Sequence, residues 1–236
     1  MGDCAQNERI FRMMDISAAL VGGLFDEDGV PAYARPVLFG TAGDAVSAYL
    51  PDAVSARFFV QGEGEPPVAG TVCVAAQEGG RFAALKALPA CGHVLVIAAP
   101  FALTEQDALY HLVQTHTAAG YGVSVLAAEQ QGFDAEGQPI PRDERCVAAV
   151  FAYEVLQKAL AAGSDSLDSL VAAAVAAGAQ KGVAVTNEIV EIRDGGSAFI
   201  AFRAMVNQVN FGLIEQGVQI FDPANTYIAP DAEIAP

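Results

Sequence analysis

Acidic and histidine residues are the first candidates for chemistry in this sequence. Asp26, Glu27 and Asp28 are consecutive and could bind a divalent cation, but no EF-hand spacing follows them, so a solvated acidic loop is favoured. His111 and His116 lie five residues apart on one predicted helix. A zinc-binding pair on a helix needs a spacing of four, and no Cys or carboxylate partner is evident, so we favour surface histidines.

The serines and the remaining histidine give no indication of nucleophilic catalysis. Ser17, Ser47 and Ser55 lack the flanking pattern of a nucleophile elbow. His93 precedes an apolar run and is interpreted as a structural hydrogen-bonding residue. The sequence contains no triad pattern, no Walker loop and no full dinucleotide fingerprint. These residues alone therefore assign no reaction.

The apolar run at residues 94–99, with the sequence Val-Leu-Val-Ile-Ala-Ala, organises the predicted fold. A short run without a polar break is typical of a strand buried on both faces. A capping-box pattern at residues 104–107 follows it and begins a helical spacing of apolar residues. This strand–helix order predicts a doubly wound, mostly parallel, Rossmann-like α/β sheet with residues 94–99 at its centre. Ligands bind at the carboxyl ends of such strands, yet Ala98-Ala99-Pro100-Phe101 offers no polar side chain there.

The other predicted elements surround this central strand in one domain, residues 15–216, with an N-terminal tail at 1–14 and a C-terminal extension at 217–236. Apolar runs predict long strands at 16–21, 55–60, 71–75, 122–127 and 146–151, and short strands at 182–185, 189–192 and 197–202. Helical spacing predicts helices at 44–50, 81–88, 154–161, 167–177 and 203–216.

Composition and charge exclude several classes of function. The chain has 236 residues, of which 53% are hydrophobic, so it can bury a large core. Its formal net charge of −16 argues against nucleic acid or an anionic membrane as partner. No apolar run reaches the roughly 18 residues of a transmembrane helix. The four cysteines form no Cys-x-x-Cys pair and have apolar neighbours, so we expect buried free thiols and a cytoplasmic location.

The last stretch of the chain carries the most specific resemblance. Residues 217–228 read Gly-Val-Gln-Ile-Phe-Asp-Pro-Ala-Asn-Thr-Tyr-Ile, and Ile228 and Ile234 lie six residues apart. This segment resembles the junction in bacterial bifunctional enzymes that join an N-acetylglucosamine-1-phosphate uridyltransferase domain to a left-handed β-helix acetyltransferase domain. The chain is similar to the uridyltransferase part and contains less than one coil of the β-helix.

The resemblance implies positions for a nucleotide site. Gly22 and Gly23 fall where the family has its glycine-rich phosphate loop, and Arg35 lies one residue before the position of a charge-neutralising family Lys. Gln77, Gly79 and Gly80 fall in a turn that reads the uracil base in the family. The alternative for this turn is plain strand-to-helix turn chemistry, where Gly-Gly is expected in any case. Asn207 falls on a family ligand of Mg²⁺, the cofactor that an active enzyme would need.

The departures from the family pattern fall on the groups that perform the reaction. Gly23 is followed by two bulky residues and then by the acidic triplet, which would repel phosphate. Pro36 replaces the Lys, so Arg35 is the remaining catalytic candidate, and Arg is not equivalent to Lys. Pro100 replaces a metal-binding Asp, which leaves Asn207 alone, and one neutral amide does not make a Mg²⁺ site.

Three functions stay open from the sequence. In the first, the chain is a relative of the sugar nucleotidyltransferases that binds a nucleotide or sugar nucleotide with catalysis lost or weak. In the second, it is an active nucleotidyltransferase that makes a nucleoside-diphosphate sugar from a sugar 1-phosphate and a nucleoside triphosphate. In the third, it is a structural or interaction protein that keeps only the fold. The oligomeric state and the identity of base and sugar do not follow from the sequence.

Overall fold

A seven-stranded sheet forms the centre of the computed structural model, which describes residues 15–25, 27–37, 40–62, 68–103, 107–130, 143–186, 189–228, 232 and 234. Along the sheet the strand order is β10 (Lys181–Thr186), β8 (Val123–Gln130), β9 (Asp143–Ala152), β6 (His93–Ile97), β1 (Ile16–Val21), β4 (Val54–Gly62) and β5 (Val72–Ala75). Neighbouring strands run parallel except at β9, which is antiparallel to both β6 and β8. The predicted mostly parallel sheet is thereby confirmed, and β6, from the central apolar run, is its middle strand.

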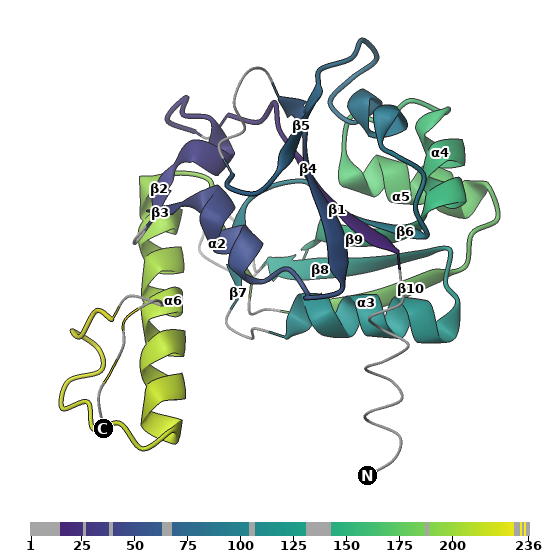
Figure 1. The fold of residues 1–236 in the computed structure, drawn as a ribbon. Helices are drawn as coiled ribbons and strands as arrows, with labels where there is room; N and C mark the ends of the chain where they lie inside the picture. The colour runs from purple at the N-terminus through teal and green to yellow at the C-terminus, as the bar shows by residue number, and fades with distance from the viewer. Residues whose placement is uncertain are drawn as a thin grey trace, which may run out of the picture.

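Helices cover both faces of the sheet, because alternate residues of each strand point to opposite sides. In β6, Leu95 and Ile97 belong to the apolar cluster that includes α2 (Ala42–Ala48) and α3 (Ala108–Ala119). Val94 and Val96 belong to the cluster on the opposite face, which includes α4 (Tyr153–Leu160) and α5 (Leu167–Ala176). All four side chains are fully buried. The strand is therefore buried on both faces, as its unbroken apolar sequence predicts (Figure 1).

Two short strand pairs lie outside the main sheet and were not predicted as pairs. Strand β7 (Phe101–Leu103) directly follows the central strand and pairs antiparallel with β11 (Ile189–Glu191). Strand β2 (Pro36–Val37) pairs antiparallel with β3 (Gly40–Thr41), after the 3-10 helix η1 (Ala32–Ala34). The two pairs form the surface on which the last helix packs.

The last helix, α6 (Gly195–Glu215), corrects the sequence prediction of a strand at 197–202. Its start is fixed by a capping box, in which Asp194 Oδ1 accepts the Ser197 N–H at 2.6 Å and Ser197 Oγ accepts the Asp194 N–H at 2.9 Å. The apolar residues after this cap therefore continue a helix, although a short apolar run alone does not distinguish helix from strand. A second correction concerns the predicted helix at 81–88, which is the 3-10 helix η2 (Ala83–Ala87).

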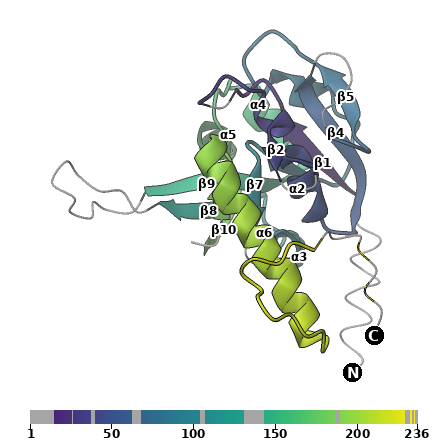
Figure 2. The ribbon, with the colours of Figure 1, turned by 90° about the vertical axis from the view of Figure 1, so that its left-hand side faces the viewer.

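The chain returns along α6 after the helix ends. Residues 217–228 form turns and irregular structure, and Asn210 Nδ2 donates to the carbonyls of Pro223 and Thr226 at 2.6 and 2.8 Å. The rings of Phe202 and Tyr227 stack with their centroids 5.2 Å apart. Figure 2 shows α6 at the surface of the molecule with this segment beside it. The predicted start of a β-helix after residue 216 stays a prediction, since only single residues beyond 228 belong to the described part of the chain.

Several sequence predictions concern residues outside the described ranges, namely the N-terminal tail 1–14, residue Asp26 and the first residues of the capping box at 104–107. Cys73, Cys91 and Cys146 are free thiols, of which Cys146 is buried and the other two are half-buried. Within the described ranges, no helix combines the length and the apolar character that crossing a membrane requires.

Candidate functional site

A small cavity lies where the carboxyl ends of β1 and β6 meet the start of α6. Its volume is about 170 Å³. We call it the edge cavity, and its lining combines apolar residues with two arginines and two glutamates, namely Leu24, Phe25, Glu27, Ala32, Ala99, Arg145, Glu191, Ile192 and Arg193. Leu24 and Ala99 follow the ends of β1 and β6, so this is the edge at which α/β sheets bind ligands.

Two arginines share one buried carboxylate in the wall of the edge cavity. Glu191 Oε2 accepts a hydrogen bond from Arg193 Nε at 2.7 Å and lies 3.2 Å from Arg145 Nη1. The Glu191 side chain is 6% exposed, whereas those of Arg145 and Arg193 are 49% and 38% exposed. Two guanidinium groups on one carboxylate give this cluster one excess positive charge, which Glu27 offsets elsewhere in the lining. Because both arginine side chains are partly exposed and line the cavity, they can pair with an anion that enters it.

The Arg81 guanidinium donates hydrogen bonds to main-chain carbonyls at the ends of the two central strands, β1 and β6. Its Nη2 donates to the carbonyl of Val21 at 2.9 Å and to the carbonyl of Ala98, and its Nε donates to the carbonyl of Gly22 at 3.1 Å. Burial lowers the pKa of the Arg81 guanidinium, and the nearby charge of Arg145 acts in the same direction. An Arg stays protonated even so. Arg81 therefore adds positive charge near the edge cavity while it holds β1 and β6 together.

The role of Arg81 was not predicted from the sequence, although Arg81 directly follows the turn at residues 77–80 that resembles the uridyltransferase family. That segment, Gln77 to Gly80, is exposed in the structure. Gly79 and Gly80 have φ angles of 111° and 97°, and a Cβ on Gly80 would lie 2.7 Å from Asp165 Oδ1. The backbone conformation and the contact with Asp165 explain both glycines without a bound base. None of the three predicted residues, Gln77 and the two glycines, lines the edge cavity.

In the predicted phosphate loop at Gly22 and Gly23, the first glycine packs against strand β4 and leaves no open space for a phosphate. The Gly22 N–H donates to the carbonyl of Val60 at 2.7 Å, and a Cβ on Gly22 would lie 2.9 Å from the ring of Phe59. Gly23 is exposed and has a φ angle of 71°. The following turn closes where the Ala32 N–H donates to the carbonyl of Leu24 at 2.9 Å. The Gly22 amide is thus engaged with the neighbouring strand.

Arg35, the predicted catalytic residue, is held by the acidic loop. Its Nη2 lies 2.7 Å from Asp28 Oδ2, and its side chain is 12% exposed. The same carboxylate accepts the N–H of Gly195 at 3.3 Å, at the start of α6. Asp28 therefore connects Arg35 to the first turn of the helix. Arg35 contacts the acidic loop, whose residue Glu27 lines the edge cavity, but Arg35 itself does not line the cavity.

The described residues do not fit a Mg²⁺ site at the strand ends. Pro100 occupies the end of β6, and its carbonyl accepts the Ile192 N–H at 3.0 Å. Asn207 is exposed on α6, twelve residues after Gly195 and so about 18 Å farther along the helix axis. In the described ranges, no three His, Cys, Asp or Glu side chains are grouped so that they could hold a metal ion.

Half-buried His93 and the buried residues His116 and Ser124 form a hydrogen-bonded chain between α3 and the sheet. His93 Nδ1 lies 3.2 Å from His116 Nε2, and His116 Nδ1 lies 3.0 Å from Ser124 Oγ. His93 is thus the structural hydrogen-bonding residue that was predicted. The prediction of a surface position was wrong for His116, which is fully buried, because its two partners satisfy both ring nitrogens. His111 is exposed as predicted. Burial, with a smaller contribution from His93, lowers the pKa of His116 to about 4.

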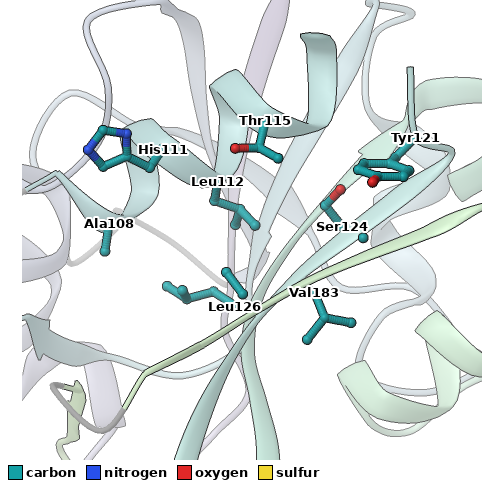
Figure 3. A pocket seen from close by; sticks show the side chains of 10 residues that line it. Ala108, His111, Leu112, Thr115, Tyr121, Ser124, Leu126 and Val183 are labelled. Carbon is teal, nitrogen blue, oxygen red and sulfur yellow. The ribbon is translucent and has the colours of Figure 1, made fainter. Parts of the chain in front are cut away.

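A larger cavity of about 270 Å³ lies between α3 and the strands β8 and β10, away from the strand ends (Figure 3). Small residues on β10, Gly182 and Ala184, leave this space open beside the helix. His111, Thr115 and Ser124 line it, but no Lys, Arg, Asp or Glu of the described ranges does. Without Lys or Arg this cavity offers a phosphate hydrogen-bond donors but no permanent positive charge. We therefore place the candidate nucleotide site at the smaller edge cavity, where arginines are present.

Comparison with known proteins places the fold. No protein-family model and no curated protein sequence matches the chain. The structure is similar to that of 2-C-methyl-D-erythritol 4-phosphate cytidylyltransferase from Thermus thermophilus, with a TM-score of 0.59 and 18% identity over 80% of this chain and 98% of that chain. The same enzyme from Francisella tularensis gives a TM-score of 0.56 and 14% identity over 79% of this chain and 98% of that chain. The chain has the nucleotidyltransferase fold.

A third similar structure is 4-diphosphocytidyl-2C-methyl-D-erythritol synthase from Anaerococcus prevotii, with a TM-score of 0.52 and 13% identity over 81% of this chain and 98% of that chain. All three names refer to cytidylyl transfer, whereas the sequence resemblance points to uridylyl transfer. Identities this low establish the shared fold and leave the base and the reaction to other arguments.

Proposed function

We propose that the protein binds a nucleotide or sugar nucleotide at the edge cavity and that its catalysis of nucleotidyl transfer is lost or weak. One observation carries this proposal. Arg145 and Arg193 converge on one carboxylate, and Arg81 lies at the adjoining strand ends, in a chain with 28 acidic and 12 basic residues. In an otherwise acidic protein these arginines provide guanidinium groups that can pair with an anionic ligand, although Glu27 and Glu191 lie beside them.

The fold supports a nucleotide as the anion. The solved structures with the same fold are named as cytidylyltransferases, and the sequence resembles uridyltransferases. Both comparisons suggest a pyrimidine nucleotide. Phe25 is 64% exposed beside the cavity and provides an aromatic face on which a ring can stack.

The expectation of weak catalysis rests on the groups that the reaction needs. Attack on the α-phosphorus develops charge on the phosphate oxygens, and metal ions and cations stabilise this charge. Arg35 is paired with Asp28, Arg81 with strand carbonyls, and Pro100 stands where the family has a metal-binding Asp. Removing one such group from an active site typically lowers the rate by a factor of about 10²–10³.

Titration calorimetry with UTP, CTP and UDP-N-acetylglucosamine tests the binding. We expect saturable binding by the natural chain and about tenfold weaker binding by Arg145→Gln, which removes one exposed guanidinium. Arg57→Gln is the matched control, because Arg57 lies in the first half of β4, away from the carboxyl ends. Equal affinities of the two variants would exclude the edge cavity as the site, and absence of any binding would favour a structural or interaction protein.

A separate assay tests the alternative of an active enzyme. Nucleoside triphosphates and sugar 1-phosphates, including UTP with N-acetylglucosamine 1-phosphate, are incubated with the natural chain and Mg²⁺, and pyrophosphate release is measured. We expect release close to background. Turnover in the ordinary enzymatic range of about 1–10³ per second, abolished in Arg35→Ala, would place the active nucleotidyltransferase first.

A further inference from the structure

Within the described part of the chain, one side of helix α6 is largely exposed to solvent, although Ile214 at its end lies beside residues 217–221. Ala198 and Ala201 are buried against the body, and Arg203 and Asn210 bind the returning chain. The remaining side carries five residues at spacings of four, three, four and three, which we call the α6 stripe: Ile200, Ala204, Asn207, Phe211 and Ile214. At 3.6 residues per turn these positions fall within about 80° of one another around the helix axis.

The α6 stripe is apolar and open to solvent. Ile200, Phe211 and Ile214 are 57%, 58% and 37% exposed, and Asn207 at the centre is also exposed. Figure 2 shows the helix along its length at the surface. Alternating spacings of four and three are the pattern by which helices pack against one another in coiled coils. A solvent-facing side of an isolated helix would instead carry charged residues.

Charge identifies a second copy of this chain as a suitable partner. The chain carries a net charge of −16, so two copies repel each other over most of their surface. Helix α6 contains no acidic residue from Gly195 to Ile214, and its one basic residue, Arg203, donates to the carbonyl of Ala224 at 2.5 Å. On the α6 stripe, two copies can therefore meet without bringing like charges together.

Asn207 gives a second reason for self-association. A two-fold pairing of the helices places the middle residue of one stripe opposite the middle residue of the other. An amide has both a donor and an acceptor, so two Asn207 side chains can satisfy each other. An apolar partner would leave a buried amide unpaired, which costs about 1–3 kcal/mol. A single polar residue in an apolar seam also fixes the register of paired helices.

The size of the stripe indicates a dimer of moderate affinity. Because an aromatic side chain buries about 150–250 Å², the exposed parts of Phe211 and the two isoleucines provide on the order of 300 Å² per copy. A stable interface of standard size buries about 800 Å² per partner, so neighbouring residues of α6 must contribute as well. From these observations we infer that the protein forms a two-fold dimer in which the α6 stripes of two copies pack together with Asn207 facing Asn207.

Sedimentation velocity of the full chain over a wide concentration range tests this pairing. We expect a reversible monomer–dimer equilibrium that strengthens as added salt screens the repulsion between the acidic copies. Phe211→Glu should raise the dissociation constant at least about tenfold, because it places a carboxylate in the apolar seam. Val72→Glu is the matched control, since Val72 is 62% exposed and lies on β5, outside α6 and the segment that follows it, and it should leave the dissociation constant unchanged.

Cysteine cross-linking tests the position of Asn207 at the two-fold axis. Asn207→Cys should form an intermolecular disulfide between identical positions under mild oxidation, identified by peptide mass spectrometry. Ala118→Cys, at an exposed position of α3, should not form the corresponding disulfide. A chain that stays monomeric at all concentrations would overturn the inference, as would equal effects of Phe211→Glu and Val72→Glu or equal cross-linking of the two cysteine variants.

Discussion

His116 is a buried residue whose ionisation couples the stability of this protein to pH. Its pKa is about 4 in the folded chain, against about 6.5 in the unfolded chain. Between these values the unfolded state binds a proton that the folded state does not. The free energy of unfolding therefore falls as the pH drops from about 6.5 to about 4, and the contribution of this one group is about 3 kcal/mol at most.

Urea unfolding of His116→Gln across this pH range tests the coupling. The variant keeps a hydrogen-bonding side chain beside Ser124 but does not titrate, so we expect a flatter dependence of the unfolding free energy on pH. His111→Gln is the control, because His111 lies on the same helix and is exposed. An unchanged slope in His116→Gln, or the same flattening in His111→Gln, would show that another group causes the dependence.

Arg81 is a second residue whose role was visible only in the structure. Arg81→Ala removes the donors to three main-chain carbonyls at the ends of β1 and β6, so we expect a loss of about 2–4 kcal/mol in unfolding free energy. Arg81→Lys should lose less, since one ammonium group can still reach some of these carbonyls. Arg57→Ala serves as the control, and a comparable loss there would mean that the strand-end contacts are not the cause.

The capping of helices provides a test at the scale of elements. Asp194 and Asp107 are the N-cap residues of α6 and α3, but only Asp194 forms a side-chain capping bond. Asp194→Ala should therefore lower the unfolding free energy by about 1 kcal/mol, and Asp107→Ala should have little effect. Chemical unfolding of both variants measures the difference. Similar losses in the two would show that the capping bond does not stabilise α6.

The arrangement of apolar residues along the sequence explains why the strands of the main sheet could be predicted and the first part of α6 could not. Residues 16–21 and 94–98 are buried on both faces, and such strands need sequences that are apolar along nearly their whole length, with Ser17 as the one polar residue here. Residues 197–202 are also largely apolar, but there the pattern arises because α6 has both a buried side and the exposed α6 stripe. The short pair β7–β11 joins residues far apart in the sequence, and a local pattern cannot indicate such a pairing.

The candidate site could be predicted only in part for a related reason. Gly22 and Arg35 were predicted as site residues from the resemblance, but neither lines the edge cavity. The arginines in the wall of the edge cavity come from β9 and from the segment before α6, so only the fold brings them together. Arg145 and Arg193 have no motif around them in the sequence. Their shared partner, Glu191, is the feature that reveals the site.

At the scale of the whole molecule, the distribution of charged residues distinguishes the two proposed binding regions. The edge cavity brings two arginines together with two glutamates, and the α6 stripe is a surface almost without charge. Nucleotide binding would therefore depend on charged side chains, whereas the pairing of two copies would depend on a surface without them. Because the α6 stripe extends along the helix away from the strand ends, Phe211→Glu is expected to change self-association without changing nucleotide affinity.

The central claim is that a nucleotide binds at the carboxyl ends of the strands, and an NMR titration of labelled protein with UTP and CTP tests it most directly. We expect saturable shifts of the amide signals of Leu24, Phe25, Ile192 and Arg193, which line the edge cavity, and much smaller shifts at His111 and Tyr121 in the larger cavity. Arg145→Gln should weaken the titration about tenfold. Shifts centred on His111 and Tyr121, or no shifts with either nucleotide, would contradict the account.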